Sequence, residues 1–251
     1  MSTWSLLAAL SLVAVGVAVS RAQSLGLEKD ILWGAFRAAL QLTVIGFVLR
    51  YVFGANHWLL TTAMVSLMIL VAGQTAAQRG KAIPHAFWLA IAGIAAGSAV
   101  TLALMVGLRI ISYRPDQVIP ISGMIVGNAM VASALVLNRL KDDADAHRAE
   151  ITAALALGAT AGQAIEPVLR RAIRTGMIPS IDSMKTVGLV QLPGMMTGLI
   201  LAGASPVQAV RYQILVAFML TCTVAVTCTT VGYLAYRRLF TPAHQLLADQ
   251  P

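Results

Sequence analysis

Two short segments place methionine thioethers within otherwise apolar sequence, and a side-chain amide ends the first segment and directly precedes the second. They are residues 120–128 (PISGMIVGN) and residues 192–198 (LPGMMTG). In each segment a proline precedes a glycine, and a methionine follows that glycine directly. A proline in or at the start of a membrane helix frees backbone carbonyls, which are tolerated where they are satisfied again or line a cavity. The two segments are therefore candidates for the walls of a transport path.

The side chains of these segments could contact a polar or metallic cargo. Met124 and Asn128 are four residues apart and share one face of a helix. The thioether of methionine is a soft ligand and the amide is a harder one. An amide within a membrane helix also pairs with a neighbouring helix, so a packed interface explains each residue taken alone. The candidate path residues are Met124, Asn128, Gln191, Met195 and Met196. Whether a metal binds there is left open.

Three glycine pairs at a spacing of four residues predict close helix packing. They are Gly93–Gly97, Gly123–Gly127 and Gly194–Gly198. Paired small residues let helix backbones approach closely in lipid. The last two pairs lie within the methionine-containing segments, so packing and cargo contact are alternatives at the same positions.

A polar, charged segment, residues 138–185, interrupts the apolar sequence. Residues 151–174 are expected to form a helix with Glu150 near its beginning, where the helix dipole favours an acid. Gly176 and Pro179 are expected to end that helix. Such a helix could lie on anionic lipid or serve as a docking element for a partner in the cytoplasm.

The composition indicates that the rest of the chain lies in a lipid membrane. Of 251 residues, 58% are hydrophobic and 11% are charged, whereas soluble domains carry roughly 25% charged residues. The net charge of +8 comes from basic residues that lie mostly between apolar runs. This pattern favours membrane topology over nucleic-acid binding.

The apolar runs predict an all-α, polytopic integral membrane protein with about seven transmembrane helices and one permease domain over residues 1–251. A span needs about 20 mostly apolar residues. The expected spans are residues 4–20, 31–53, 58–78, 84–111, 118–140, 184–203 and 209–236. An outside N-terminus and a cytoplasmic C-terminus leave only Arg50, Arg109, Arg114 and Arg211 outside, as the positive-inside rule requires. The charged segment then lies in the cytoplasm between spans five and six.

Several segments together resemble the FetB/YbbM-type permease family, which includes plant aluminium-tolerance relatives. They are residues 35–49 (AFRAALQLTVIGFVL), 120–130 (PISGMIVGNAM), 154–160 (ALALGAT), 177–182 (MIPSID) and 186–212, which contains LPGMMTG. Residues 153–160 also resemble the EAA loop of ABC-transporter membrane subunits, although Thr152 stands where that motif has a glutamate.

The resemblance implies a permease subunit of an ATP-driven ABC transporter in a bacterial inner membrane, exporting a metal ion such as iron. It implies two copies of this chain and a separate cytoplasmic ATP-binding subunit that holds the ATP. The residues implied in coupling to that partner are Glu150, Thr152, Ala153, Ala154, Gly158, Ala159, Arg170, Arg171 and Arg174.

The chain itself is not expected to be an enzyme or to carry a cofactor. It contains no P-loop and no dinucleotide-binding glycine motif. The alternative is a self-contained ion channel or secondary carrier. Carriers driven by ions usually hold an acidic residue within the bilayer, and the expected span interiors contain no Asp or Glu.

Overall fold

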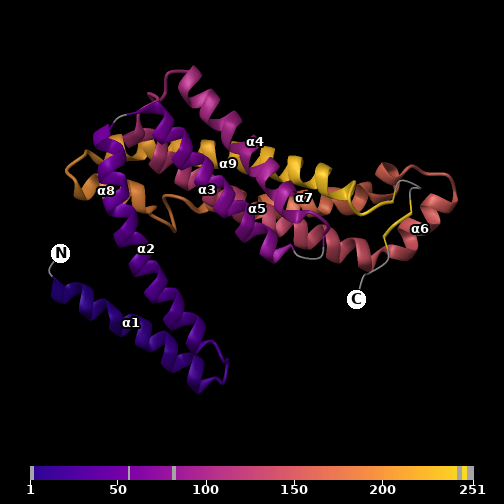
Figure 1. Cartoon of the computed structure of the whole chain (residues 1–251), viewed down its shortest axis with the longest axis horizontal. Coiled ribbons are helices and arrows are strands. Elements are labelled where there is room, and N and C mark those ends of the chain that lie inside the picture. The colour runs from indigo at the N-terminus through magenta and orange to yellow at the C-terminus, as the bar shows by residue number, and fades with distance from the viewer. Residues whose placement is uncertain (1–2, 56, 81–82, 242–244, 248–251) are drawn as a thin grey trace. The chain divides into compact units, whose positions relative to one another are not determined.

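The computed structural model describes residues 3–55, 57–80, 83–241 and 245–247 (Figure 1). Over these residues it is helical, with two isolated β-bridges and no strand. The chain divides into two compact units, Met1–His57 and Trp58–Pro251. The expected all-α class is confirmed.

The first unit contains helices α1 (Thr3–Ala22) and α2 (Glu28–Ala55). A polar contact orders the turn between them: the Ser20 hydroxyl donates to Glu28 Oε1 at 2.9 Å and accepts from the Leu27 amide at 3.1 Å. Along α2, Leu42 and Phe47 are 70% and 71% exposed. Large apolar side chains directed away from the protein suit a lipid surrounding.

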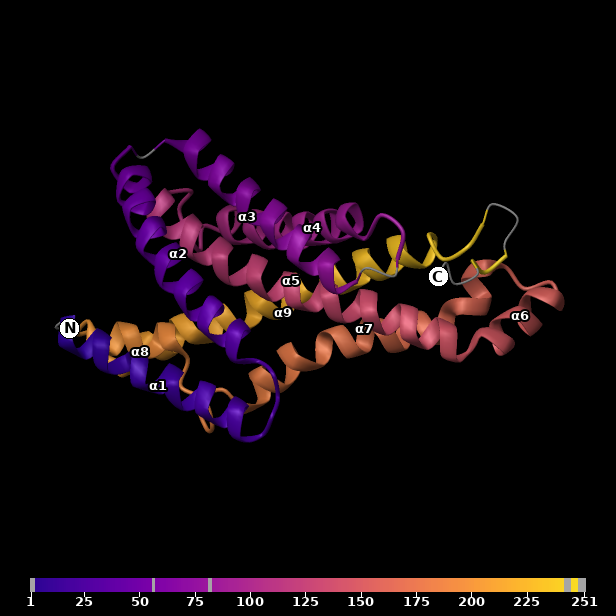
Figure 2. The ribbon, with the colours of Figure 1, turned by 60° about the horizontal axis from the view of Figure 1, so that its bottom comes forward.

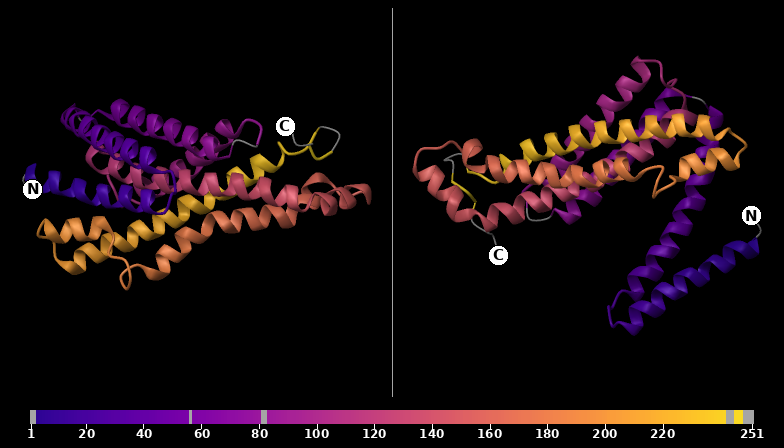
Figure 3. Two further views of the ribbon diagram at one scale, coloured as in Figure 1. Left: turned by 90° about the horizontal axis from the view of Figure 1, so that it is seen from below. Right: turned by 180° about the vertical axis from the view of Figure 1, so that it is seen from behind.

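The second unit is an elongated helix bundle (Figures 2 and 3). Its long helices are α3 (Trp58–Arg79), α4 (Ala86–Gly107), α5 (Pro115–Ala146), α7 (Ala161–Thr186) and α9 (Pro206–Tyr236). Helices α5 and α9 are central, because both pack on each other, on α4 and on α7.

Two short helices mark opposite ends of this unit. Helix α6 (Arg148–Ala156) lies at one end together with the C-terminal tail, which we define as residues 237–241 and 245–247 (Figure 2). Helix α8 (Gly194–Leu201) lies at the other end, beside the beginning of α9. Helices α5, α7 and α9 therefore connect the two ends.

Small residues let α4 pack closely on α9. A Cβ on Gly97 would overlap Thr227 Oγ1 and lie 2.7 Å from the Thr223 carbonyl oxygen, and a Cβ on Gly93 would overlap Val231. Close by, the hydroxyls of Thr101 and Thr223 form a buried hydrogen bond of 2.7 Å. The packing predicted for Gly93 and Gly97 is confirmed.

The helices support a multi-pass membrane protein. Within the described residues, α2, α3, α4, α5 and α9 are long and apolar enough to cross a membrane. Helix α1 has 20 residues, and its stretch Leu10–Ala22 is a shorter apolar helix. Seven crossings remain a prediction.

The single helix expected over residues 151–174 is wrong: it is interrupted by a turn, and the two helices α6 and α7 extend beyond both expected ends. Helix α6 ends at Ala156, and Gly158 then adopts a φ of +90°, which a non-glycine residue rarely takes. Thr160 and Gln163 form a reciprocal capping box that starts α7. Helix α7 continues through Gly176 and Pro179 to Thr186, because its buried face packs along α5 and α9.

The span expected over residues 184–203 is not a continuous helix. Gly188 has a φ of +86° and Pro193 caps α8, so α7 and α8 are separated by a loop. Helix α8 has 8 residues and rises about 12 Å, whereas a bilayer core is about 30 Å thick. The helix that returns from the α6 end toward the α8 end is α7.

Candidate functional site

Predicted path residues from different helices meet at one cavity of about 330 Å³. Met124 and Asn128 reach it from α5, Met195 from α8 and Gln191 from the loop between α7 and α8. Met196 follows Met195 on α8 but does not line this cavity. The structure thus brings together residues that are far apart in sequence.

Local hydrogen bonds position these side chains. Asn128 Nδ2 donates to the Met124 carbonyl at 2.9 Å, one helical turn earlier. Between α7 and α8, the Gly188 amide donates to the Gln191 carbonyl at 2.9 Å, which closes a tight turn. Thr197 Oγ1 donates to the Gly194 carbonyl at 3.0 Å in the first turn of α8.

Gln213 on α9 also lines this cavity and was missed by the sequence analysis. Its side chain is buried, and its Oε1 has no hydrogen-bond partner within the described chain. Buried polar atoms usually have a partner, so an unpartnered one is notable. The available signal was an amide in an apolar span, which is the argument that selected Asn128.

A second cavity of about 520 Å³ adjoins the first. Met124, Met195 and Val216 line both cavities. The second cavity is more apolar, and Met105 and Met219 from the buried core add two further thioethers to its wall.

The remaining predicted packing glycines have no close neighbour within the chain. A Cβ at any of them would meet no atom of another helix within 4 Å in the described structure. They are Gly123, Gly127, Gly194 and Gly198. Their role in packing remains a prediction.

The residues implied in coupling mostly surround α6 and the turn that follows it. Glu150, Thr152 and Ala153 on α6 are exposed, and Ala154 is half-buried. In the turn, Gly158 is exposed and Ala159 is half-buried. Leu157 is 89% exposed, although it is a large apolar residue. Thr152, Gly158 and Ala159 also line a pocket of about 690 Å³ beside the C-terminal tail.

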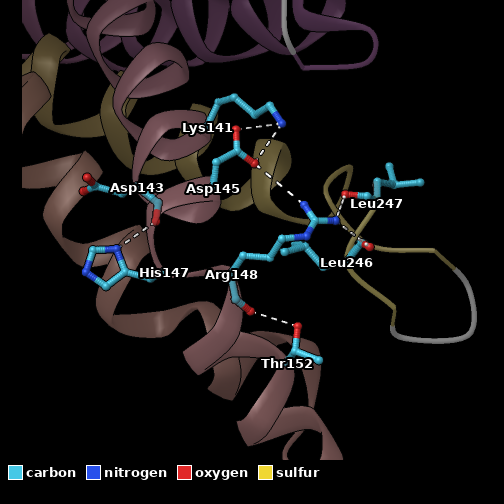
Figure 4. Close-up of polar contacts among 8 residues, drawn as sticks. All are labelled: Lys141, Asp143, Asp145, His147, Arg148, Thr152, Leu246 and Leu247. Carbon is cyan, nitrogen blue, oxygen red and sulfur yellow. Dashed lines mark hydrogen bonds and ion pairs between the residues drawn. The ribbon is translucent and has the colours of Figure 1, made fainter. Parts of the chain in front are cut away.

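Arg148 fixes the C-terminal tail beside this pocket (Figure 4). Its Nη2 donates to the carbonyl oxygens of Leu247 at 2.6 Å and Leu246 at 3.4 Å. Its Nη1 lies 3.9 Å from Asp145, which itself pairs with Lys141 at 2.9 Å. One guanidinium therefore joins the end of α5, the start of α6 and the tail.

We expect Arg148→Ala to release the tail from α6. Loss of two hydrogen bonds from a half-buried cation should cost about 1 kcal/mol, so amide exchange at residues 245–247 should speed up about fivefold. Hydrogen–deuterium exchange followed by mass spectrometry measures this. Arg170→Ala is the matched control, because Arg170 is exposed and pairs with Glu166 on α7. Equal exchange in the two variants would contradict the anchoring role.

Asp143 is a buried carboxylate between α5 and α7 that the sequence analysis did not single out. Its Oδ2 lies 3.0 Å from Arg139 Nε and 3.9 Å from Arg171 Nε. The geometry makes these contacts ion pairs and not hydrogen bonds. All three arginines, Arg170, Arg171 and Arg174, are exposed, and Arg171 is the one that reaches Asp143 on α5. Arg170 lies nine residues beyond the start of α7, about 14 Å along the helix from the α6 turn.

The described residues contain no group of three His, Cys, Asp or Glu side chains that could hold a metal ion. The donors that the 330 Å³ cavity offers are neutral: amides, hydroxyls and thioethers. Such a site can select by donor softness and hydrogen bonding, but not by opposite charge.

Comparison with known proteins places almost the whole chain in one group. Residues 3–240 match the family described as "Uncharacterised protein family (UPF0014)". The chain is similar to the "Probable iron export permease protein FetB" of Escherichia coli K12, with 45% identity over 246 residues. That alignment covers 98% of this chain and 95% of the relative.

Two further relatives extend this similarity to other organisms. The "UPF0014 membrane protein YjkA" of Bacillus subtilis is 43% identical, with 95% of each chain covered. The "Protein ALUMINUM SENSITIVE 3" of Arabidopsis thaliana is 40% identical, with 95% of this chain and 88% of the relative covered. No solved structure matches the chain significantly.

Proposed function

Because the chain belongs to the UPF0014 family of membrane proteins, we propose that it is the permease subunit of an ATP-driven exporter of a metal ion such as iron. The cargo in this proposal comes from the printed name of the Escherichia coli relative. The transport path follows the cavity between α5, α7, α8 and α9.

The observation that carries the proposal is the exposed α6 turn at the end of two long helices. Helix α5 has 32 residues and rises about 48 Å, more than the roughly 30 Å of a bilayer core. It can therefore hold α6 beyond the membrane. The exposed Leu157 and the open turn at Gly158 offer a surface that a partner protein could cover.

In this proposal a separate cytoplasmic subunit binds and hydrolyses ATP, and two copies of this chain form the membrane part. The chain lies in a bacterial inner membrane with its N-terminus outside and its C-terminus in the cytoplasm. Both α6 and the C-terminal tail are assigned to the cytoplasm, and their position at the same end of the second unit supports that assignment (Figure 3).

Co-purification with an ATP-binding protein encoded beside this chain tests the proposal. The two proteins are expressed together, solubilised in mild detergent and separated by size. We expect one complex whose ATPase activity needs both proteins. If the chain purifies alone and moves ions across liposome membranes without nucleotide, it is a self-contained channel or carrier and the proposal fails.

We expect Asn128→Leu to lower transport more than it lowers abundance. Asn128 is exposed beside the cavity and its amide nitrogen donates to a carbonyl of its own helix, so the fold loses little when the amide is removed. Transport per molecule should fall about tenfold if the amide contacts the cargo. Uptake into inverted vesicles, normalised to protein amount, measures this. If lower abundance of the variant fully explains its lower transport, Asn128 contributes to packing and not to cargo contact.

A further inference from the structure

Two methionines separate the cavities within the bundle. Met124 on α5 and Met195 on α8 line both the 330 Å³ cavity and the 520 Å³ cavity. Both side chains are half-buried and pack against the buried core. Val216 on α9 is the third residue shared by the two linings, so a cargo that moves between the cavities at this point passes these three side chains, and only the methionines carry a donor atom.

The side-chain amides of Asn128 and Gln213, near this passage, have oxygen atoms that can accept a hydrogen bond or bind a cation. Asn128 uses its nitrogen to bond the Met124 carbonyl, which leaves Oδ1 outside that bond. Gln213 is 9% exposed, and its Oε1 is buried with no partner in the described chain. The terminal torsion of an amide is soft, so rotation can turn this oxygen toward the cavity that Gln213 lines. An acceptor without a donor is satisfied by a cation or by a donor group.

No carboxylate lines the 330 Å³ cavity. Asp116 lines the 520 Å³ cavity, where its carboxylate is paired with Arg114 at 3.2 Å. Hard ions such as Mg²⁺ and Ca²⁺ prefer carboxylate, carbonyl and water oxygens, whereas thioethers favour softer metals. A neutral donor set also holds a cation weakly enough to release it, which conduction requires. The donors therefore favour a softer transition metal over the abundant hard ions.

On the basis of the proposed function, we propose that the cargo binds between the cavities as a bare soft or borderline transition-metal cation. Met124 and Met195 supply thioether sulfur, and Asn128 and Gln213 supply amide oxygen. The thioethers exclude hard divalent ions. Gln213 is a cargo-binding residue in addition to those that the sequence suggested.

Metal binding to the full-length chain in lipid nanodiscs tests this proposal. The probes are Ag⁺ as a redox-stable soft cation, Fe²⁺ under anaerobic conditions as a borderline cation, and Mg²⁺ as a hard cation. Bound metal is measured by mass spectrometry after buffer exchange, and affinity by competition with a chelator. We expect Ag⁺ and Fe²⁺ to bind and Mg²⁺ not to compete with them.

Replacement of each donor by leucine separates coordination from packing, because leucine and methionine have similar volumes. We expect Met124→Leu, Met195→Leu and Gln213→Leu each to weaken Ag⁺ and Fe²⁺ binding about tenfold or more. The matched controls are Met130→Leu on α5 and Gln208→Leu on α9, since neither residue lines either cavity. We expect both controls to bind metal as the unchanged chain does.

X-ray absorption of the metal-loaded, unchanged chain gives a result that does not depend on any variant. Sulfur next to bound Ag⁺ or Fe²⁺ supports the proposal, and a shell of oxygen alone overturns it. Unaltered affinity for Ag⁺ and Fe²⁺ in both methionine variants also overturns it. Binding of Mg²⁺ in preference to Ag⁺ and Fe²⁺ overturns it too. Binding of Ag⁺ without Fe²⁺ supports the site and argues against iron as the cargo.

Co-purification with the ATP-binding protein is independent of all these results, so the cargo assignment can fail while the permease assignment stands.

Discussion

A Gly158→Trp variant should reach the membrane in nearly normal amount but lose most ATP-driven transport. Gly158 lies in the exposed turn between α6 and α7, and a Cβ added there would meet no atom within 4 Å in the described part of the chain. The added ring would therefore occupy the surface that the ATP-binding partner is proposed to cover. Overpacking of a tight contact costs about 1–3 kcal/mol, so coupling should fall about tenfold or more.

The backbone at Gly158 complicates this variant, because its φ of +90° strains any residue with a side chain. Gly158→Asn is the matched control, since asparagine tolerates positive φ better than other residues. We expect Gly158→Asn to keep most transport and most complex formation. The measurements are nucleotide-dependent transport in vesicles and co-purification of the partner. Normal transport by Gly158→Trp would remove this turn from the coupling surface.

A Gly176→Ala variant should lower stability, and Gly176→Leu should prevent normal accumulation in the membrane. A Cβ at Gly176 would lie 2.6 Å from Val136 Cγ2 on α5 and 2.8 Å from Cys228 Sγ on α9. Three helices therefore meet at a point that has no room for a side chain. For leucine we expect a loss of about 3 kcal/mol and a fall in apparent Tm of about 5–10 °C.

Gly107→Ala and Gly107→Leu are the matched controls. Gly107 is the last residue of α4, and a Cβ there would meet nothing within 4 Å. Alanine is a better helix former than glycine by about 1 kcal/mol, so Gly107→Ala should not lower stability. Thermal unfolding in detergent, followed by fluorescence-detected gel filtration, compares the four variants. Equal Tm values for the alanine variants at both positions would contradict the three-helix contact at Gly176.

The proposed coupling surface and the proposed path are joined by continuous helices. Helix α5 carries Met124 and Asn128 and leads to α6, while α7 returns from the α6 turn to the cavity wall at Ser183. The ion pair between Asp143 and Arg171 and the close contact at Gly176 tie α5 to α7 between these points. In the proposed mechanism, a displacement of α6 moves both cavity walls together.

Much of the architecture follows from the sequence, because hydropathy acts over contiguous residues. The apolar runs predicted the spanning helices α2, α3, α4, α5 and α9, and the lipid environment makes helix formation obligatory there. The resemblance to the FetB/YbbM-type permease family, which was based on segments such as LPGMMTG, was confirmed by the UPF0014 match over residues 3–240. The candidate path residues Met124, Asn128, Gln191 and Met195 were also selected from sequence. The structure places them at one cavity, and their role in transport stays a prediction.

Only the tertiary structure determined where the polar segment breaks and which helix packs along α5 and α9 in place of the expected sixth span. A helix with Arg170, Arg171 and Arg174 does not resemble a membrane span in sequence. Its buried stripe nevertheless packs on α5 and α9. Contacts between distant residues decide such cases, and a local hydropathy window does not include them.

The same reason explains the site residues that sequence reasoning missed. Gln213, Asp143 and Arg148 have ordinary neighbours in sequence, and their distinction lies in what surrounds them in space. An unpartnered acceptor, a buried carboxylate between two helices and a guanidinium that holds the tail are all properties of long-range contacts. The sequence by itself determined the membrane environment, the long apolar helices and the family of this protein. The tertiary structure decided which polar groups remain unpaired, because pairing depends on which helices meet.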